Sequence, residues 1–155
     1  MATVGPFTFV AEAASAGIQQ ANDSPHEWGQ GGEGFGKRLG NNMAYNAIRQ
    51  TITYGLSEAL HEDNRYFKSK KQGFGGRLLY ALESPAIAYK EGHRRLSISS
   101  LSGMVGAAGI SQAWAPQSWK GVDNAAANFG LTYAGQAGLN VAREFLPDLI
   151  KKLHK

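Results

Sequence analysis

The densest group of chemically capable side chains lies at positions 61–65, in the run His61-Glu62-Asp63-Asn64-Arg65. An imidazole, two carboxylates and a guanidinium within five residues can act in general acid/base catalysis or supply a pair of metal ligands. Neighbouring residues of one helix or strand point in different directions, however, so these side chains cannot all converge on one atom. The spacing therefore favours a structural interpretation, in which His61 lies at the negative end of a helix and Arg65 clamps a carboxylate or a carbonyl.

A glycine-rich segment at 26–36 contains two short matches to phosphate-binding motifs. Residues 29–34 form GxGxxG and residues 31–37 form GxxxxGK, and both patterns can cradle phosphate after a strand. No strand is expected before them, and Arg38 stands where a P-loop has Ser or Thr. We therefore expect a flexible connecting loop at 26–36. With no HExxH motif and no recognisable nucleophile–base pair, we also expect no cofactor and no metal site.

Composition indicates one folded domain with a mild basic excess. The 155 residues carry a net charge of +4 at a pI near 9.4, and they include no cysteine. The length suits a single helical domain over 1–155, and the lack of cysteine excludes disulfides and thiolate metal sites. A basic excess suits anionic lipid or nucleic acid, but we expect solvated surface and do not expect nucleic acid as a partner. No signal peptide is visible at the start of the chain.

Hydrophobic periodicity predicts an all-α fold, a compact bundle of about four helices. The expected helices are Pro6–Ala21, Lys37–Glu62, Ser99–Ala115 and Gly121–Phe145. A short helical turn is expected at 77–83. Alternation about Lys90-Glu91-Gly92-His93 predicts a small β-hairpin that pairs 86–90 with 94–98. The alternative there is a helix capped by Ser84 with Pro85 at its first position.

Small residues recur every fourth position in the last two helices, which predicts close Gly/Ala/Ser-mediated packing between them. The five-residue connection 116–120 favours an antiparallel pair. A polar stripe runs roughly opposite the small stripe of the last helix, and it faces either water or the interior. The predicted packing residues are Gly103, Ala107, Ser111, Ala126, Gly130, Ala134 and Gly138, and the amides of the polar stripe are Asn124, Asn128, Gln136 and Asn140.

Several short runs along nearly the whole chain resemble a family of small bacterial helical proteins of uncharacterised function, found largely in Acidobacteria. They are Pro6-Phe7-Thr8-Phe9, Ser15-Ala16-Gly17-Ile18, Gly34-Phe35-Gly36-Lys37-Arg38, Asp63-Asn64-Arg65-Tyr66-Phe67, 103–108 and 143–148. Members of that family usually show Asp-Pro-Arg-Tyr-Phe, so Asn64 departs at one position. They usually carry an N-terminal signal sequence, so the resemblance implies export to the cell envelope or periplasm. It implies no reaction, ligand or catalytic residue.

These observations favour a non-enzymatic helical protein of the bacterial cell envelope that is structural or self-assembling. Membrane association is a further expectation, because the uncharged stretches 96–119 and 124–142 are long enough to span a bilayer. Their polar residues argue against spanning. One alternative is a protein that binds an apolar small molecule in a groove lined by Trp114, Phe129 and Tyr133. The second alternative is an enzyme that uses the His61–Arg65 cluster.

Overall fold

The structure is a computed structural model that describes residues 6–153, so both ends of the expected domain 1–155 lie outside the described residues. The main elements are α1 (Pro6–Ala21), α2 (Gly31–Leu60), α3 (Phe74–Glu83), β1 (Ile87–Lys90), β2 (His93–Leu96), α4 (Ile98–Ile110) and α5 (Val122–Leu153). Single 3-10 turns lie between them: η1 (His26–Trp28), η2 (Ser84–Ala86), η3 (Ser111–Ala113) and η4 (Gln117–Trp119). The chain is mainly α-helical, as the periodicity predicts.

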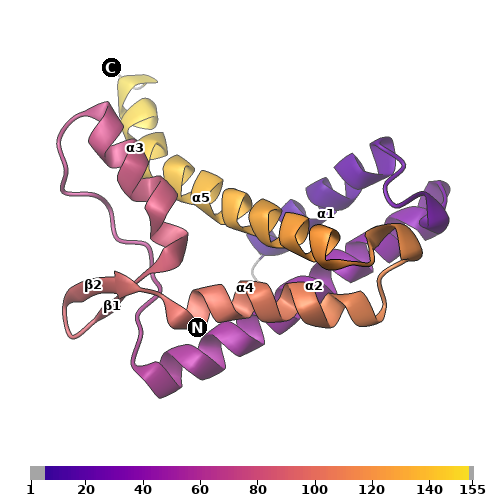
Figure 1. The fold of residues 1–155 in the computed structure, drawn as a ribbon. Coiled ribbons are helices and arrows are strands. Elements are labelled where there is room, and N and C mark those ends of the chain that lie inside the picture. Colours follow the sequence, from indigo (N-terminus) through magenta and orange to yellow (C-terminus); the bar gives the residue numbers. More distant parts are fainter. Residues whose placement is uncertain (1–5, 154–155) are drawn as a thin grey trace.

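The helices form a bundle in which α2 and α4 share the most extensive contact. Figure 1 shows α5 above α4 in this view, with α3 beside the C-terminal part of α5 and α1 beside the N-terminal part of α2. Because α5 touches both α3 and α4, it connects the hairpin end of the molecule with the pair of helices α2 and α4.

The hairpin prediction is confirmed. β1 and β2 pair antiparallel from Ile87 opposite Leu96 to Lys90 opposite His93. Glu91 and Gly92 both have positive φ, 53° and 78°, as a two-residue hairpin turn that follows the strand twist requires. An isolated bridge between Asp63 and Tyr89 adds two backbone hydrogen bonds to β1. The hairpin therefore rests on the segment that follows α2 rather than standing alone.

The start of α2 corrects the expected loop at 26–36. The helix begins at Gly31, six residues before the expected start, so the glycine-rich segment forms its first turns. A Cβ at Gly34 would overlap the carbonyl oxygen of Gly29 and approach Arg38 Nη1 to 2.8 Å. The missing side chain thus lets the helix start against the preceding turn, and this contact outweighs the low helix propensity of glycine.

Three other boundaries also differ from the prediction. The turn expected at 77–83 is the longer helix α3, and α4 ends at Ile110, after which η3 follows. α5 continues through Pro147 to Leu153 instead of ending near 145–147. Arg77 Nη2 lies 2.8 Å from the Glu144 carbonyl oxygen and 2.7 Å from Asp148 Oδ2. These contacts hold the turns on both sides of the proline, which by itself favours a break.

The interior of the bundle is polar to an unusual degree. The buried apolar residues are mostly small: Ala16, Tyr80, Ala81, Ala88, Met104, Ala107, Ala108 and Ala137. An equal number of polar and charged residues is buried: Arg38, Asn42, Asn46, Ser97, Ser99, Ser111, Asn140 and Glu144. Among the side chains that the structure describes, no Leu, Ile, Val or Phe is buried. In the first half of α2 the stripe of Arg38, Asn42 and Asn46 faces inward, whereas Tyr54 and Glu58 further along the same stripe are exposed.

Candidate functional site

The side chains of the cluster at 61–65 diverge. His61 has a left-handed backbone (φ 55°) and caps the C-terminus of α2 with its N–H. Glu62 accepts hydrogen bonds from the backbone N–H groups of Ile98 (3.2 Å) and Ser99 (2.9 Å), so it caps the first turn of α4. Asp63 instead pairs with Arg65 at 2.7 Å. The structure therefore does not bring these four side chains to one point.

The pKa values of the two acids fit these structural roles. Burial alone would raise the pKa of Glu62, but hydrogen bonds from the Ser99 hydroxyl and from the start of α4 lower it. The Arg65 guanidinium lowers the pKa of Asp63. Both groups are stabilised as carboxylates, which makes them poor proton carriers near neutral pH. No group of three His, Cys, Asp or Glu within the described part of the chain could hold a metal ion.

The three aromatic residues do not enclose a ligand groove. Phe129 and Tyr133 lie on one face of α5 with ring centroids 6.4 Å apart, and the Tyr133 hydroxyl donates to the Leu82 carbonyl at 3.0 Å. Trp114 instead donates its Nε1–H to Asn41 Oδ1 at 2.9 Å. The cavity in the structure is lined by other residues and is polar. Nothing in the arrangement of these rings supports an apolar ligand.

The two small stripes meet different surroundings. Gly103, Ala107 and Ser111 of α4 are buried, and a Cβ at Gly103 would overlap Thr53 Oγ1 and lie 2.8 Å from the Arg49 carbonyl oxygen. The small stripe of α4 therefore packs on α2. The matching stripe of α5 is exposed: Ala126, Gly130, Ala134 and Gly138. The predicted packing of these two stripes against each other is wrong.

The amide stripe of α5 faces the interior instead. Asn124, Asn128 and Gln136 are half-buried and Asn140 is buried. Asn124 Nδ2 donates to the carbonyl oxygens of Ser118 (3.1 Å) and Lys120 (3.0 Å) and so closes the turn that precedes α5. This orientation explains why the small stripe of α5 is exposed, because the amide stripe and the small stripe lie on roughly opposite sides of that helix.

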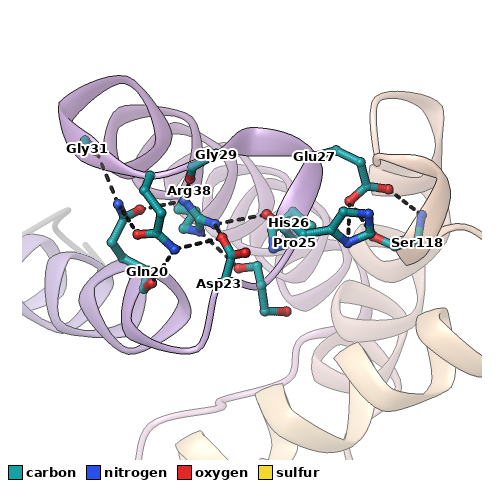
Figure 2. A network of polar contacts seen from close by, with 11 residues as sticks. Gln20, Asp23, Pro25, His26, Glu27, Gly29, Gly31, Arg38 and Ser118 are labelled. Carbon is teal, nitrogen blue, oxygen red and sulfur yellow. Dashed lines mark hydrogen bonds and ion pairs between the residues drawn. The ribbon is translucent and has the colours of Figure 1, made fainter.

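Sequence reasoning missed a buried arginine that organises the connection from α1 to α2. Arg38 is fully buried and donates to the carbonyl oxygens of Ser24 (3.0 Å), Gly29 (2.7 Å) and Pro25 (2.9 Å) and to the Gln20 side chain. Figure 2 shows its guanidinium enclosed by the turn. The rigid five-donor fork of arginine can satisfy several carbonyls at once. The local sequence Gly36-Lys37-Arg38 did not indicate that Arg38 would be buried in this turn.

The same turn contacts the segment before α5 through Glu27. Its carboxylate accepts hydrogen bonds from the Ser118 hydroxyl (2.7 Å) and the Ser118 N–H (2.9 Å), as Figure 2 shows. These hydrogen bonds lower the pKa of Glu27 to about 2. Glu27 therefore remains ionised near neutral pH and joins η1 to η4.

A second missed residue is Glu144, a fully buried carboxylate on the amide stripe. It accepts hydrogen bonds from the Tyr66 hydroxyl (2.6 Å), the Ser69 N–H (3.0 Å) and Arg77 Nε (2.7 Å). Burial alone would raise its pKa, but these hydrogen bonds and the Arg77 charge lower it. The sequence did contain one indication of this role. Glu144 lies on the same stripe as Asn128 and Asn140, and a carboxylate on a stripe that faces inward needs a hydrogen-bond partner.

One exposed apolar surface is the outer side of α5. We use the name α5 outer face for a set of exposed residues on this side: Ala126, Ala127, Gly130, Leu131, Ala134, Gly135, Gly138 and Leu139. Leu131 is 71% exposed and Leu139 is 49% exposed. None of the residues from 124 to 142 is charged. Large exposed apolar patches of this kind mark interaction surfaces, and this face is our candidate functional site.

Three comparisons with known proteins identify no family for the chain. A scan against protein-family models found no match, and searches of curated proteins and of solved structures found none either. The chain is therefore placed only in the broad class that its fold defines, a mainly α-helical protein with one small hairpin. Within the described range, no helix is both long and apolar enough to cross a membrane.

Proposed function

We propose that the protein is a non-enzymatic structural subunit that associates with further copies of itself through the α5 outer face. The observation that supports this proposal best is that large apolar side chains such as Leu131 and Leu139 are exposed while as many polar as apolar residues are buried. The resemblance to exported bacterial proteins supports the cell envelope or periplasm as the place of assembly.

The chemistry of the α5 outer face defines what can cover it. The face offers methyl and methylene groups and no charge over about four helical turns. An apolar partner surface gains free energy of about 25 cal/mol for each Å² of apolar area that leaves water. The glycines and alanines leave no bulky side chain between the backbones, so a second helix can approach closely.

The chain exposes more surface than a compact monomer of its mass. A compact monomer of 16.6 kDa exposes about 7,600 Å², whereas this chain exposes 9657 Å². Exposed apolar side chains such as Leu131 and Leu139 contribute to this surplus.

The chemistry of the α5 outer face favours a second copy of the chain as its partner. Most homo-oligomers are two-fold symmetric, and a two-fold axis brings the same patch of both subunits together. Such an interface requires a self-complementary patch. An uncharged stripe of Gly and Ala beside Leu131 and Leu139 satisfies this requirement, because it has no like charges to repel and no bulk to clash across the axis.

Sedimentation velocity in detergent-free buffer tests the proposal. We expect the wild-type chain to sediment as a dimer or larger assembly. Leu131→Lys should shift it toward monomer, because the ammonium group would have to be buried without a partner. Gln72→Lys is the matched control, since it adds the same charge in the exposed loop before α3 and should leave the assembly unchanged.

Two outcomes would overturn the proposal. One is a monomeric wild-type chain at every concentration tested. The other is an assembly that Leu131→Lys and Gln72→Lys affect equally. A monomer that co-sediments with phosphatidylglycerol vesicles, and loses this binding in Leu131→Lys, would assign the α5 outer face to a membrane surface instead.

A further inference from the structure

The inner side of α5 borders a polar cavity that self-association does not use. It has a volume of about 70 Å³ and lies between α5, the start of α4 and the segments 64–66 and 84–87. This volume has room for several water molecules, and hence for a small ligand such as acetate.

The cavity is lined by hydrogen-bond donors that lack an acceptor. Asn140 is 94% buried, with a relative exposure of 6%, yet its Nδ2 makes no hydrogen bond to any described residue. Its Oδ1 only meets Arg143 Nη1 at 3.4 Å. Gln136, one turn earlier on the same stripe, makes no side-chain hydrogen bond within the described range. The NH₂ groups of both amides are therefore available to an occupant of the cavity.

The hydroxyl groups of the cavity do not fill this role, because their protons are already used. The Tyr66 hydroxyl donates to Glu144 Oε2 at 2.6 Å. Ser84 Oγ donates to the Tyr80 carbonyl oxygen and Ser100 Oγ to the Pro85 carbonyl oxygen. The donor groups that line the cavity and make no strong hydrogen bond belong to Gln136, Asn140 and Arg143, whereas Asn64 Nδ2 already donates to Ser99 Oγ at 2.7 Å.

The charges around the cavity further limit the kind of ligand that it can bind. Arg143 forms no ion pair with any carboxylate in the described part of the chain. The nearby acids are already compensated: Glu144 by Arg77 at 2.7 Å, and Glu62 by the first turn of α4. A negative charge in the cavity would therefore meet one free guanidinium and two amide donors. A carboxylate matches the planar fork of arginine and accepts from several donors at once.

We propose that this cavity binds a small carboxylate, held by Arg143, Asn140 and Gln136. Gln136 and Asn140 lie on the inward amide stripe, whereas Arg143 is exposed and lies one turn beyond Leu139 of the α5 outer face, so it borders the cavity from the edge of that face. The proposal gives the inward amide stripe a function beyond packing.

Titration of the full chain with acetate, followed by ¹H–¹⁵N NMR, tests this site. We expect saturable shifts of the Asn140 and Gln136 side-chain NH₂ signals. Acetamide has the same size and shape without the charge, and should bind at least about tenfold more weakly, since hydrogen bonds between charged groups are the stronger ones. Arg143→Gln should lose acetate affinity by a similar factor. Arg95→Gln, an exposed arginine on β2, is the matched control and should bind acetate like the wild type.

The backbone amide spectrum of each variant shows whether it is folded, and Arg143 is exposed, so its replacement should be tolerated. The proposal is wrong if acetate and acetamide shift the same signals equally, or if Arg143→Gln binds acetate like the wild type. Absence of saturable shifts would show that the cavity holds water only. Saturation by phosphate without saturation by acetate would reject the carboxylate and leave a tetrahedral anion as the ligand.

Discussion

Glu144 shows how a single buried charge can connect segments that are distant in the sequence. It sits on α5 and binds Tyr66 and Ser69 of the loop after α2 and Arg77 of α3. A buried carboxylate without partners would be strongly unfavourable, but this one has three donors. The hydrogen bonds fix the position of the loop 61–73, which has almost no regular structure of its own.

Replacing this carboxylate should therefore destabilise the fold. Glu144→Gln keeps the shape but removes the charge that Arg77 pairs with and places an NH₂ group against donors. Losing one partner of a fully buried pair costs about 3–5 kcal/mol, and we expect about 2–3 kcal/mol because the Arg77 side chain is 22% exposed. Urea denaturation at pH 7 measures the loss. Glu58→Gln, on the exposed side of α2, should change stability by less than about 0.5 kcal/mol.

The cost of Glu144→Gln should also depend on pH. The pKa of Glu144 is lower in the folded chain than its ordinary value of 4.5, so the unfolded chain takes up the proton first as the pH falls. The stabilisation by this carboxylate is complete above pH 4.5 and is lost progressively below it. The difference between the wild type and Glu144→Gln should shrink between pH 4.5 and more acidic values. A constant difference would show that the carboxylate gains nothing from its charge.

At the scale of elements, the contact between α2 and α4 depends on the missing side chain of Gly103. Gly103→Ala would place a methyl group against Thr53 and the Arg49 carbonyl oxygen, a backbone atom that cannot rotate away. We expect a loss of about 1–3 kcal/mol from overpacking. Gly109→Ala on the same helix meets nothing within 4 Å and should gain up to about 1 kcal/mol of helix propensity. Thermal melts of both variants compare them directly, and equal melting temperatures would contradict the packing at Gly103.

The helices and the hairpin could be predicted from the sequence because each has a local signal. The period of apolar residues marks the helices, and alternation around Glu91-Gly92 marks the hairpin. The orientation of the helices could not be predicted in the same way. A stripe pattern shows that a helix has distinct faces, but Gly and Ala stripes suit both a tight interior and a bare surface. The structure places the stripe of Gly103 inside and that of Gly130 outside.

The hydrogen-bond partners of the buried charged residues could not be predicted from the sequence either. Arg38 binds Ser24, Pro25 and Gly29, and Glu144 binds Tyr66, Ser69 and Arg77. Each set of partners comes from other segments, so no local spacing reveals it. The cluster at 61–65 had the opposite problem, because its residues are adjacent in the sequence but serve three different contacts.

At the scale of the whole molecule, the chain buries alanine, serine, asparagine and two charged residues, while leucines such as Leu79, Leu131 and Leu139 are exposed. Hydrophobic burial is the main favourable term in folding, so a single copy obtains less of it than a domain of this size normally does. The polar network specifies how the helices meet, and it contributes less net free energy for each group than apolar burial. A second copy on the α5 outer face would add the apolar burial that the single chain lacks.

This relation predicts that the stability of the protein depends on its own concentration. If copies associate in the folded state and not in the unfolded state, association stabilises the fold by mass action. The melting temperature of the wild type should rise with protein concentration, and a stabilisation of 1 kcal/mol corresponds to about 2–4 °C for a chain of this size. Leu131→Lys should melt at one temperature at all concentrations, below that of the wild type, whereas Gln72→Lys should follow the wild type. Differential scanning calorimetry over a dilution series measures these shifts, and a wild-type melting temperature that stays constant would show that one copy is stable with its polar core alone.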